Sequence, residues 1–303
     1  MNCNHSWLAS GDWTRMLRSR IDNVPLLLQC TPAWQPYRSY GVPFSVRSSS
    51  DALLRQVTAD LPPGTRPYAS GAAGRAFAVC EPASPCMCGQ SHDGWQVSSG
   101  STSYAVPGRD EALDVVRLWV KQYVAERAPR RVFVHAGVVA FGSQAVLIPG
   151  DSMSGKTTLV SALLRAGALY YSDEYAVLDA SGRVWPYPQK LGMRRPGEGA
   201  AQHPVDAAVL GAVVARASSR AALIVVSRYE AGRSWSPQVA GPSDGAMALL
   251  AQSPAARRHP QRVLATLAAA ASASQCLQGS RGDADETAAL IVDYLRQLPA
   301  HPR

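Results

Sequence analysis

The chain has 303 residues, which is enough for one large domain or two modest ones. Hydrophobic residues make up 47% and charged residues 17%, a globular composition that excludes a disordered chain. No apolar stretch reaches the length of about 18 residues that a spanning helix needs, so we expect no membrane partner. The first residues lack the basic and apolar regions of a secretory signal, and we therefore expect a cytoplasmic location.

The net charge of +8 comes from an unusual set of cations. Of the 30, 27 are Arg and only three are Lys, namely Lys121, Lys156 and Lys190. Such a skew is typical of a GC-rich genome, and the arginines are scattered without a basic run interleaved with aromatic residues. We therefore expect no nucleic-acid partner, and the skew directs attention to each lysine that remains.

The first part of the chain, residues 1–130, is punctuated by turn-forming clusters at 61–65 and 98–103. Short strands are predicted at 43–47, 76–80 and 95–98. A helix is predicted at 109–127, because apolar residues recur there at helical spacing. We expect an α+β region over residues 1–130 that contributes to substrate recognition.

The second part, residues 131–303, has a more regular texture. Runs rich in β-branched residues predict strands at 132–139, 145–149, 169–178, 183–185 and 221–227. Helical patterns are predicted at 156–166, 243–251, 257–271 and 284–298, with Gly167 placed to end the first of them. The order of strands and helices indicates an α/β domain.

One motif in this domain carries chemistry. It reads G-x-x-x-x-G-K-T and consists of Gly150, Asp151, Ser152, Met153, Ser154, Gly155, Lys156 and Thr157, with Thr158 next in line. Glycines let consecutive backbone N–H groups point at a phosphate, and the following helix directs its positive N-terminal end to the same anion. Lys156 would reach the β- and γ-phosphates, and the Thr157 hydroxyl would bind Mg²⁺.

The alternative is an ordinary Gly/Ser turn that happens to contain a lysine. The context favours the phosphate-binding loop, because an apolar strand precedes it and an amphipathic helix follows. The residue type at position 156 agrees, because a compact ammonium suits a crowded phosphate site better than a planar guanidinium does.

Two further features lie close in sequence to this motif. Asp173 and Glu174 end the next predicted strand, where one carboxylate can hold Mg²⁺ and another can accept a proton from a hydroxyl. On a continuous strand adjacent side chains point to opposite faces, so both can face the phosphate only if the strand has ended. His135 lies in the strand before the motif; a buried structural imidazole and a solvated acidic strand end are the alternatives.

These residues together resemble a known family. His135-Ala136-Gly137, the loop 150–158, the segment 165–168 and Ser172-Asp173-Glu174 are similar in order and spacing to the catalytic domain of HPr kinase/phosphorylase. The resemblance extends to its smaller relatives, which include the HPr-kinase-like enzymes of lasso-peptide clusters. It covers about residues 131–230 well, and residues 1–130 do not resemble the family's N-terminal domain.

The resemblance implies a P-loop kinase core akin to phosphoenolpyruvate carboxykinase rather than a Ras-like parallel sheet. It implies that Lys156 binds phosphate, that Thr157 and Asp173 bind Mg²⁺, and that Glu174 is the catalytic base. It places His135 at the active site and matches Arg220 with a family arginine.

The chain also departs from the family. A Glu-x-Arg-Gly segment is expected near 191–199, where this chain has Gly192-Met193-Arg194-Arg195-Pro196-Gly197-Glu198, and Glu198 is a candidate replacement for the missing acid. No counterpart of the phosphorylase segment is found, so a kinase-only enzyme is expected. Separately, Cys80, Cys86, Cys88 and His92 could hold Zn²⁺, although their spacing is uncommon and a reduced surface loop is the alternative.

The resulting hypothesis is an ATP- and Mg²⁺-dependent kinase that phosphorylates a hydroxyl, most simply a Ser, on a peptide or small protein. A ribosomally made peptide precursor and an HPr-like protein both fit as acceptors. A nucleotide-binding regulatory module without kinase activity and a small-molecule kinase or carboxykinase-type enzyme are the alternatives. The acceptor, the choice between ATP and GTP, and homo-oligomer formation stay open.

Overall fold

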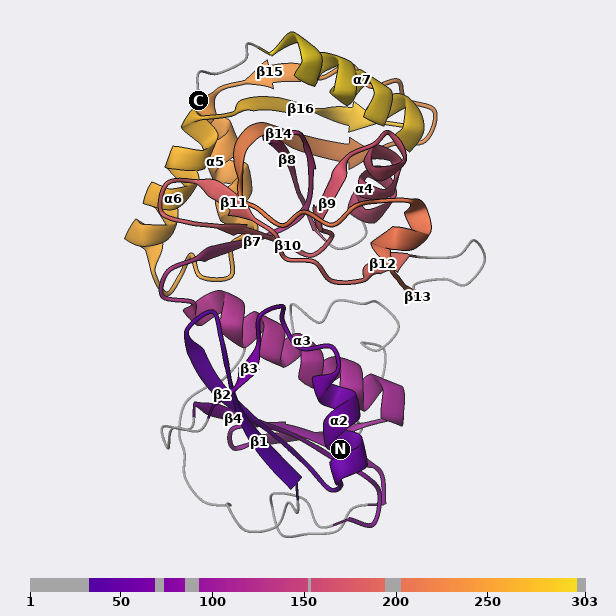
Figure 1. The fold of residues 1–303 in the computed structure, drawn as a ribbon, viewed down its shortest axis with the longest axis vertical. Coiled ribbons are helices and arrows are strands. Elements are labelled where there is room, and N and C mark those ends of the chain that lie inside the picture. The colour runs from indigo at the N-terminus through magenta and orange to yellow at the C-terminus, as the bar shows by residue number, and fades with distance from the viewer. Residues whose placement is uncertain (1–32, 69–73, 85–92, 152–153, 194–202, 299–303) are drawn as a thin grey trace, which may run out of the picture.

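Two sheets, each with its own helices, lie one above the other along the long axis of the molecule in the computed structural model (Figure 1). The structure describes residues 33–68, 74–84, 93–151, 154–193 and 203–298. Over these ranges the fold is mixed α/β, as expected, with six α-helices. No helix within them is long and apolar enough to cross a membrane.

The first sheet is built by the N-terminal part of the chain and has the order β3-β1-β2-β4-β5-β6. Its strands are β1 (Ala33–Ser39), β2 (Val42–Ser48), β3 (Arg66–Pro67), β4 (Arg75–Cys80), β5 (Trp95–Ser99) and β6 (Thr102–Val106), and its helices are α2 (Asp51–Thr58) and α3 (Arg109–Arg127). Tyr40 and Gly41 both have positive φ, 47° and 84°, which gives the two-residue turn that suits the β1–β2 hairpin. The described part of this region therefore contains both a sheet and helices.

The second sheet has the order β11-β10-β7-β8-β14-β16-β15, and β9 pairs with β7. Its strands are β7 (Val132–Phe141), β8 (Gln144–Pro149), β9 (Leu169–Ser172), β10 (Tyr175–Leu178), β11 (Arg183–Trp185), β14 (Ser219–Tyr229), β15 (Gln238–Ala240) and β16 (Gln275–Arg281). β8, β14 and β16 run parallel, whereas β7 is antiparallel to β8. Since β11 also pairs with β14, strands β7, β8, β14, β11 and β10 form a closed ring.

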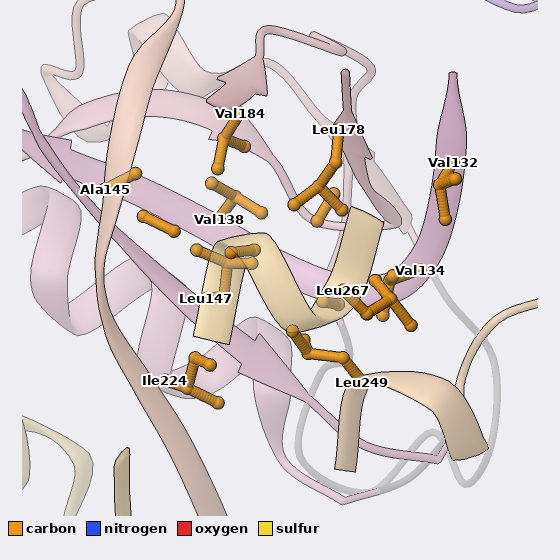
Figure 2. Close-up of a cluster of buried hydrophobic side chains, with 14 of the residues drawn as sticks. Val132, Val134, Val138, Ala145, Leu147, Leu178, Val184, Ile224, Leu249 and Leu267 are labelled. Carbon is orange, nitrogen blue, oxygen red and sulfur yellow. The ribbon is translucent and has the colours of Figure 1, made fainter. Parts of the chain in front are cut away.

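Helices cover both faces of the second sheet. They are α4 (Lys156–Arg165), α5 (Pro242–Ala251), α6 (Pro260–Ser272) and α7 (Ala284–Gln297), with the pair β12 (Leu191–Met193) and β13 (His203–Val205) and the 3₁₀ turn η2 (Ala207–Leu210) beside them. Successive side chains of β8 point to opposite faces of the sheet. Leu147 packs under α5 and α6, as Figure 2 shows, while Ile148 packs with α4 and α7.

A third core cluster joins the two sheets. Phe133, Tyr175 and Tyr187 of the second part share it with apolar residues of α2, α3 and the first sheet. Tyr40 contacts the ring of Phe133 edge-on, with centroids 5.1 Å apart. Burying one such aromatic side chain contributes about 2–3 kcal/mol, so the two parts are held by a hydrophobic core and not by a loose linker.

Most predicted elements are confirmed, and two corrections affect the site. The predicted single strand over 169–178 is wrong, because it breaks at Asp173 and Glu174 into β9 and β10. The side-chain oxygen of Ser172 accepts from the backbone N–H groups of Glu174 and Tyr175, which stabilises the turn. The strand β16, which lies between β14 and β15, was not predicted. The helix predicted from 257 begins at Pro260, a residue that favours the first helical position.

Candidate active site

The predicted motif residues meet at one edge of the second sheet. β8, β14 and β16 are parallel, and β9 runs in the same direction as β8 because both are antiparallel to β7. The loop after β8 and the acidic pair after β9 therefore lie at the same edge. Ligands in α/β proteins bind at this carboxyl edge of the strands.

The loop after β8 leads directly into α4 and surrounds the side chain of Lys156. The Nζ atom donates to the carbonyl oxygens of Gly150 and Asp151, each at 2.7 Å, and the residue is only 7% exposed. Gly155 has φ +82°, a left-handed conformation that glycine adopts at little cost. No acidic residue lies in the first turn of α4, so its positive end is not offset by a carboxylate.

Behind this loop lies a buried arginine that sequence reasoning missed. The Nη2 atom of Arg281, at the end of β16, donates to the carbonyl oxygen of Gly155 at 2.7 Å. A Cβ atom at Gly155 would lie 2.5 Å from that nitrogen, so only a glycine at this position lets the arginine come this close to the backbone. Arg281 holds the last loop residue before α4, and the strand pattern that carries it is too polar to be recognised from sequence.

The hydroxyl of Thr157 and the carboxylate of Asp173 are brought together from α4 and from the end of β9. Thr157 Oγ1 donates to Asp173 Oδ2 at 2.9 Å, and the backbone N–H of Gly192 in β12 donates to the same oxygen at 3.3 Å. The other oxygen, Oδ1, is buried and has no hydrogen-bond partner among the described residues. Burial raises the pKa of Asp173 to about 6, although the hydrogen bonds from Thr157 and Gly192 oppose that rise.

These two residues fit a magnesium ion. A buried carboxylate oxygen without a partner, next to a hydroxyl, is an all-oxygen donor set of the kind that Mg²⁺ prefers. Two protein ligands are enough, because Mg²⁺ in phosphoryl-transfer sites takes its other ligands from phosphate and water. Asp173 and Thr157 would hold it.

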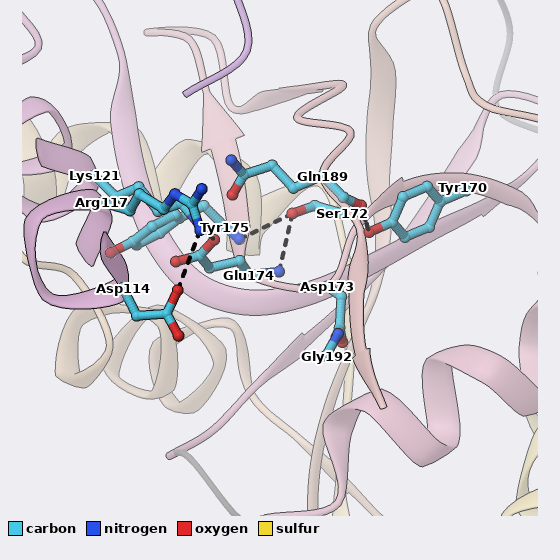
Figure 3. Close-up of polar contacts among 10 residues, drawn as sticks. All are labelled: Asp114, Arg117, Lys121, Tyr170, Ser172, Asp173, Glu174, Tyr175, Gln189 and Gly192. Carbon is cyan, nitrogen blue, oxygen red and sulfur yellow. Dashed lines mark hydrogen bonds and ion pairs between the residues drawn. The ribbon is translucent and has the colours of Figure 1, made fainter. Parts of the chain in front are cut away.

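Glu174 faces another direction from its neighbour. Figure 3 shows its side chain directed toward α3, where Oε2 lies 3.0 Å from the Nζ atom of Lys121. Both side chains are largely buried, 25% and 15% exposed, so solvent ions screen their attraction less than that of a surface pair. One of the three lysines of the chain thus links α3 of the N-terminal part to the acidic pair, a contact between residues 53 apart in sequence.

His135 lies on β7 next to these groups. It is paired with Tyr175 in the sheet, and its backbone N–H donates to the Gln252 carbonyl oxygen. Two residues further, a Cβ atom on Gly137 would lie 2.5 Å from Val160 Cγ2, so this glycine lets α4 approach the strand closely. Burial, with the nearby charge of Lys156 second, lowers the pKa of His135 to about 4.

We therefore expect the imidazole of His135 to be neutral at pH 7. Its pKa is about 6.5 in the unfolded chain and about 4 in the folded one, so the folded state loses stability as the pH falls through 6.5 toward 4. The loss at pH 5 is about 2 kcal/mol. NMR titration of the histidine rings and urea unfolding at pH 7 and pH 5 measure both effects. His135→Gln should remove this part of the pH dependence, and a His135 ring that titrates near pH 6.5 would contradict the assignment.

Other predicted residues do not join the site or fall outside the described ranges. Arg220 is paired with Gln144 at the start of β8, the opposite end of the strand from the loop, so its match with a family arginine is corrected. Thr158 is exposed on α4. Several predicted residues lie outside the described ranges, namely Ser152, Met153, Glu198, Cys86, Cys88 and His92. The zinc hypothesis therefore stays a prediction. Within the described ranges, no group of three or more His, Cys, Asp or Glu residues could hold a metal ion.

Comparisons with known proteins add no family assignment. No family model matches the chain, and no curated protein matches it.

Proposed function

We propose that this protein is an ATP-dependent kinase that transfers the γ-phosphate to a serine hydroxyl of a peptide or small protein. One observation carries the proposal: the strand–loop–helix unit places Lys156 inside the loop and Thr157 against Asp173 at 2.9 Å. This combination of a lysine, a hydroxyl and a buried carboxylate is the set that P-loop enzymes use on a nucleotide triphosphate with Mg²⁺.

The residues divide the work on the donor. The ammonium of Lys156 and the N-terminal end of α4 bind the β- and γ-phosphates, and Thr157 and Asp173 hold Mg²⁺. When bound, Mg²⁺ neutralises charge that develops on the transferred phosphate. His135, neutral at pH 7, offers a hydrogen bond beside the phosphates without adding a second positive charge next to Lys156.

On the acceptor side we assign Glu174 as the base. The bond between the γ-phosphorus and the bridging β,γ-oxygen breaks, a bond forms from the serine oxygen to phosphorus, and the serine proton goes to the Glu174 carboxylate. The products are ADP and phosphoserine. Lys121 of α3 would hold this carboxylate in place, which connects the N-terminal part with acceptor recognition.

The sheet supports the finer part of the fold proposal. Strand β8 leads into the loop. It pairs with the antiparallel strand β7 on one side, as a hairpin, and with the parallel strand β14 on the other. A mixed sheet of this kind agrees with the carboxykinase-related core that the family resemblance implies and differs from an all-parallel sheet. We therefore propose the HPr-kinase-like P-loop core for residues 131–303.

The direct test is phosphate transfer from γ-labelled ATP in the presence of Mg²⁺, with a panel of serine-containing peptides and small proteins. We expect label on serine in at least one acceptor and no transfer when Mg²⁺ is chelated. If ATP fails to bind, as judged by thermal stabilisation, the nucleotide site itself is refuted.

The second candidate is a nucleotide-binding regulatory module without kinase activity. The observation that favours it is the Lys121–Glu174 ion pair, because a paired carboxylate must exchange its partner before it can accept a proton. Binding of ATP without transfer across the panel would favour the module, and transfer to any serine would exclude it.

A further inference from the structure

An open pocket of about 480 Å³ lies between the two parts of the molecule, outside the site described above. It is lined by Arg38, Tyr40, Gly41, Pro129, Arg130 and Arg131, and we name it the arginine pocket. Its lining comes from the β1–β2 hairpin and from the segment between α3 and β7. The lining carries three positive charges and no negative one.

None of these three guanidinium groups contacts a carboxylate among the described residues. Arg38 donates to the Tyr68 hydroxyl and lies over its ring, 3.7 Å from the centroid. Arg131 lies 4.5 Å from the ring centroid of Trp185 and donates to the backbone oxygen of Arg130 at 3.2 Å. Ring contacts explain where two of the side chains lie. One carboxylate, that of Asp179, lies beside a ring partner, where it accepts from Trp185 Nε1 at 2.7 Å, but it forms no ion pair with the three arginines.

Further cations lie near the segment between α3 and β7. Arg262 of α6 donates to the carbonyl oxygens of Ala128 and Pro129, the latter residue being part of the lining. The pKa of Arg127, at the end of α3, is lowered by burial and next by the charge of Arg258. The acidic residue nearest in sequence, Glu126, is paired with Arg127 at 2.9 Å. Like charges gathered in this way repel one another, and a bound anion relieves that repulsion.

The pocket connects with the active site through a row of aromatic rings. Tyr40, in the pocket wall, lies 6.1 Å from Tyr187 between ring centroids, Tyr187 lies 5.7 Å from Tyr175, and Tyr175 lies 6.0 Å from His135. Three ring-to-ring steps therefore separate the pocket from the phosphate end of β7. An extended peptide of about ten residues spans roughly 33 Å, which is long enough to reach from one to the other.

We propose that the arginine pocket binds an acidic segment of the phosphate acceptor, through Asp or Glu carboxylates. Arg38 and Arg131 are held by their aromatic partners with guanidinium groups that match a carboxylate in bidentate geometry. Nucleic acid fits less well, because single strands need exposed rings for base stacking and the rings of Tyr68 and Trp185 are already covered by arginines. This inference rests on the proposed kinase function for the identity of the ligand.

The probe is a fluorescein-labelled decaglutamate peptide, and its binding is measured by fluorescence anisotropy without nucleotide. We expect wild-type protein to bind it in a salt-dependent manner and Arg130→Glu to raise the Kd by about tenfold or more. Arg130 is exposed and lies outside the core, so this variant should unfold at the wild-type temperature. Arg296→Glu makes the same charge change on α7, at the far end of the molecule in Figure 1, and should bind like wild type.

Two kinds of result would overturn the inference. The first is a wild-type Kd in Arg130→Glu or an equal loss in Arg296→Glu. The second is tighter, Arg130-dependent binding of oligothymidylate of equal charge, which would assign the pocket to nucleic acid. The proposed function fails separately, since absence of phosphate transfer leaves decaglutamate binding unchanged. Once an acceptor is known, Arg130→Glu should raise the KM of the acidic acceptor and leave kcat and ATP affinity unaltered.

Discussion

Lys156→Ala is expected to lower phosphate transfer by about 10³-fold, because it removes the positive charge that would stabilise the negative charge of the phosphate oxygens in the transition state. The Nζ atom is held by the carbonyl oxygens of Gly150 and Asp151 at 2.7 Å each, so it is already positioned before the nucleotide arrives. A charge that is held in position before the reaction stabilises the transition state most, because it need not be reoriented during phosphate transfer.

The control variants separate charge from folding. Lys190→Ala removes an exposed lysine and should keep wild-type activity. Lys156→Arg keeps the charge but should also lose most of the activity, because a planar guanidinium does not fit a position that is only 7% exposed inside the loop. Transfer rates and the thermal stabilisation by ATP·Mg²⁺ are the measurements. Wild-type turnover in Lys156→Ala would contradict the assignment of this loop to the phosphates.

Local pattern was sufficient to predict the strand–loop–helix unit of the candidate site. β8, the loop and α4 are contiguous, so the apolar run before Gly150 and the helical spacing after Lys156 determine them without reference to the rest of the chain. The same holds for α3, whose buried residues fall at the predicted spacing. These are the elements for which neighbours in sequence are also neighbours in space.

Contacts between residues far apart in sequence could not be predicted from local pattern. β16 has only two apolar residues, the adjacent Cys276 and Leu277, and contains Gly279, so it lacks a strand pattern. It nevertheless pairs with the buried β14 and places Arg281 behind the loop. Lys121 attracted attention only as one of three lysines, and its contact with Glu174 depends on how α3 packs against the second sheet. Sequence spacing alone cannot predict a contact between residues that only the packing of α3 against the second sheet brings together.

The adjacent carboxylates should respond differently to amide substitution. Asp173→Asn is expected to abolish Mg²⁺-dependent transfer and, without ligands, to stabilise the protein at pH 7–8. The pKa of Asp173 is raised from 3.8 to about 6, so the folded state binds the proton more tightly than the unfolded chain. Its contribution to stability is therefore present below pH 4 and lost as the pH rises through 6, and the amide should recover about 2–3 kcal/mol at pH 8.

Urea unfolding of wild type and Asp173→Asn at pH 5 and pH 8 measures this gain. The difference in unfolding free energy between the two proteins should be larger at pH 8 than at pH 5. An equal difference at both pH values would show that Asp173 titrates normally in the folded protein.

Glu174→Gln is expected to lower transfer to serine by about 10²- to 10³-fold while ATP·Mg²⁺ binding stays at the wild-type level, because a base acts on the acceptor and not on the donor. Lys121→Met keeps the carboxylate and removes only its partner, so its loss should be smaller, about tenfold, if Lys121 serves to position Glu174. A Glu174→Gln enzyme that transfers phosphate at the wild-type rate would move the base to another residue and leave the ion pair as a structural link between α3 and the second sheet.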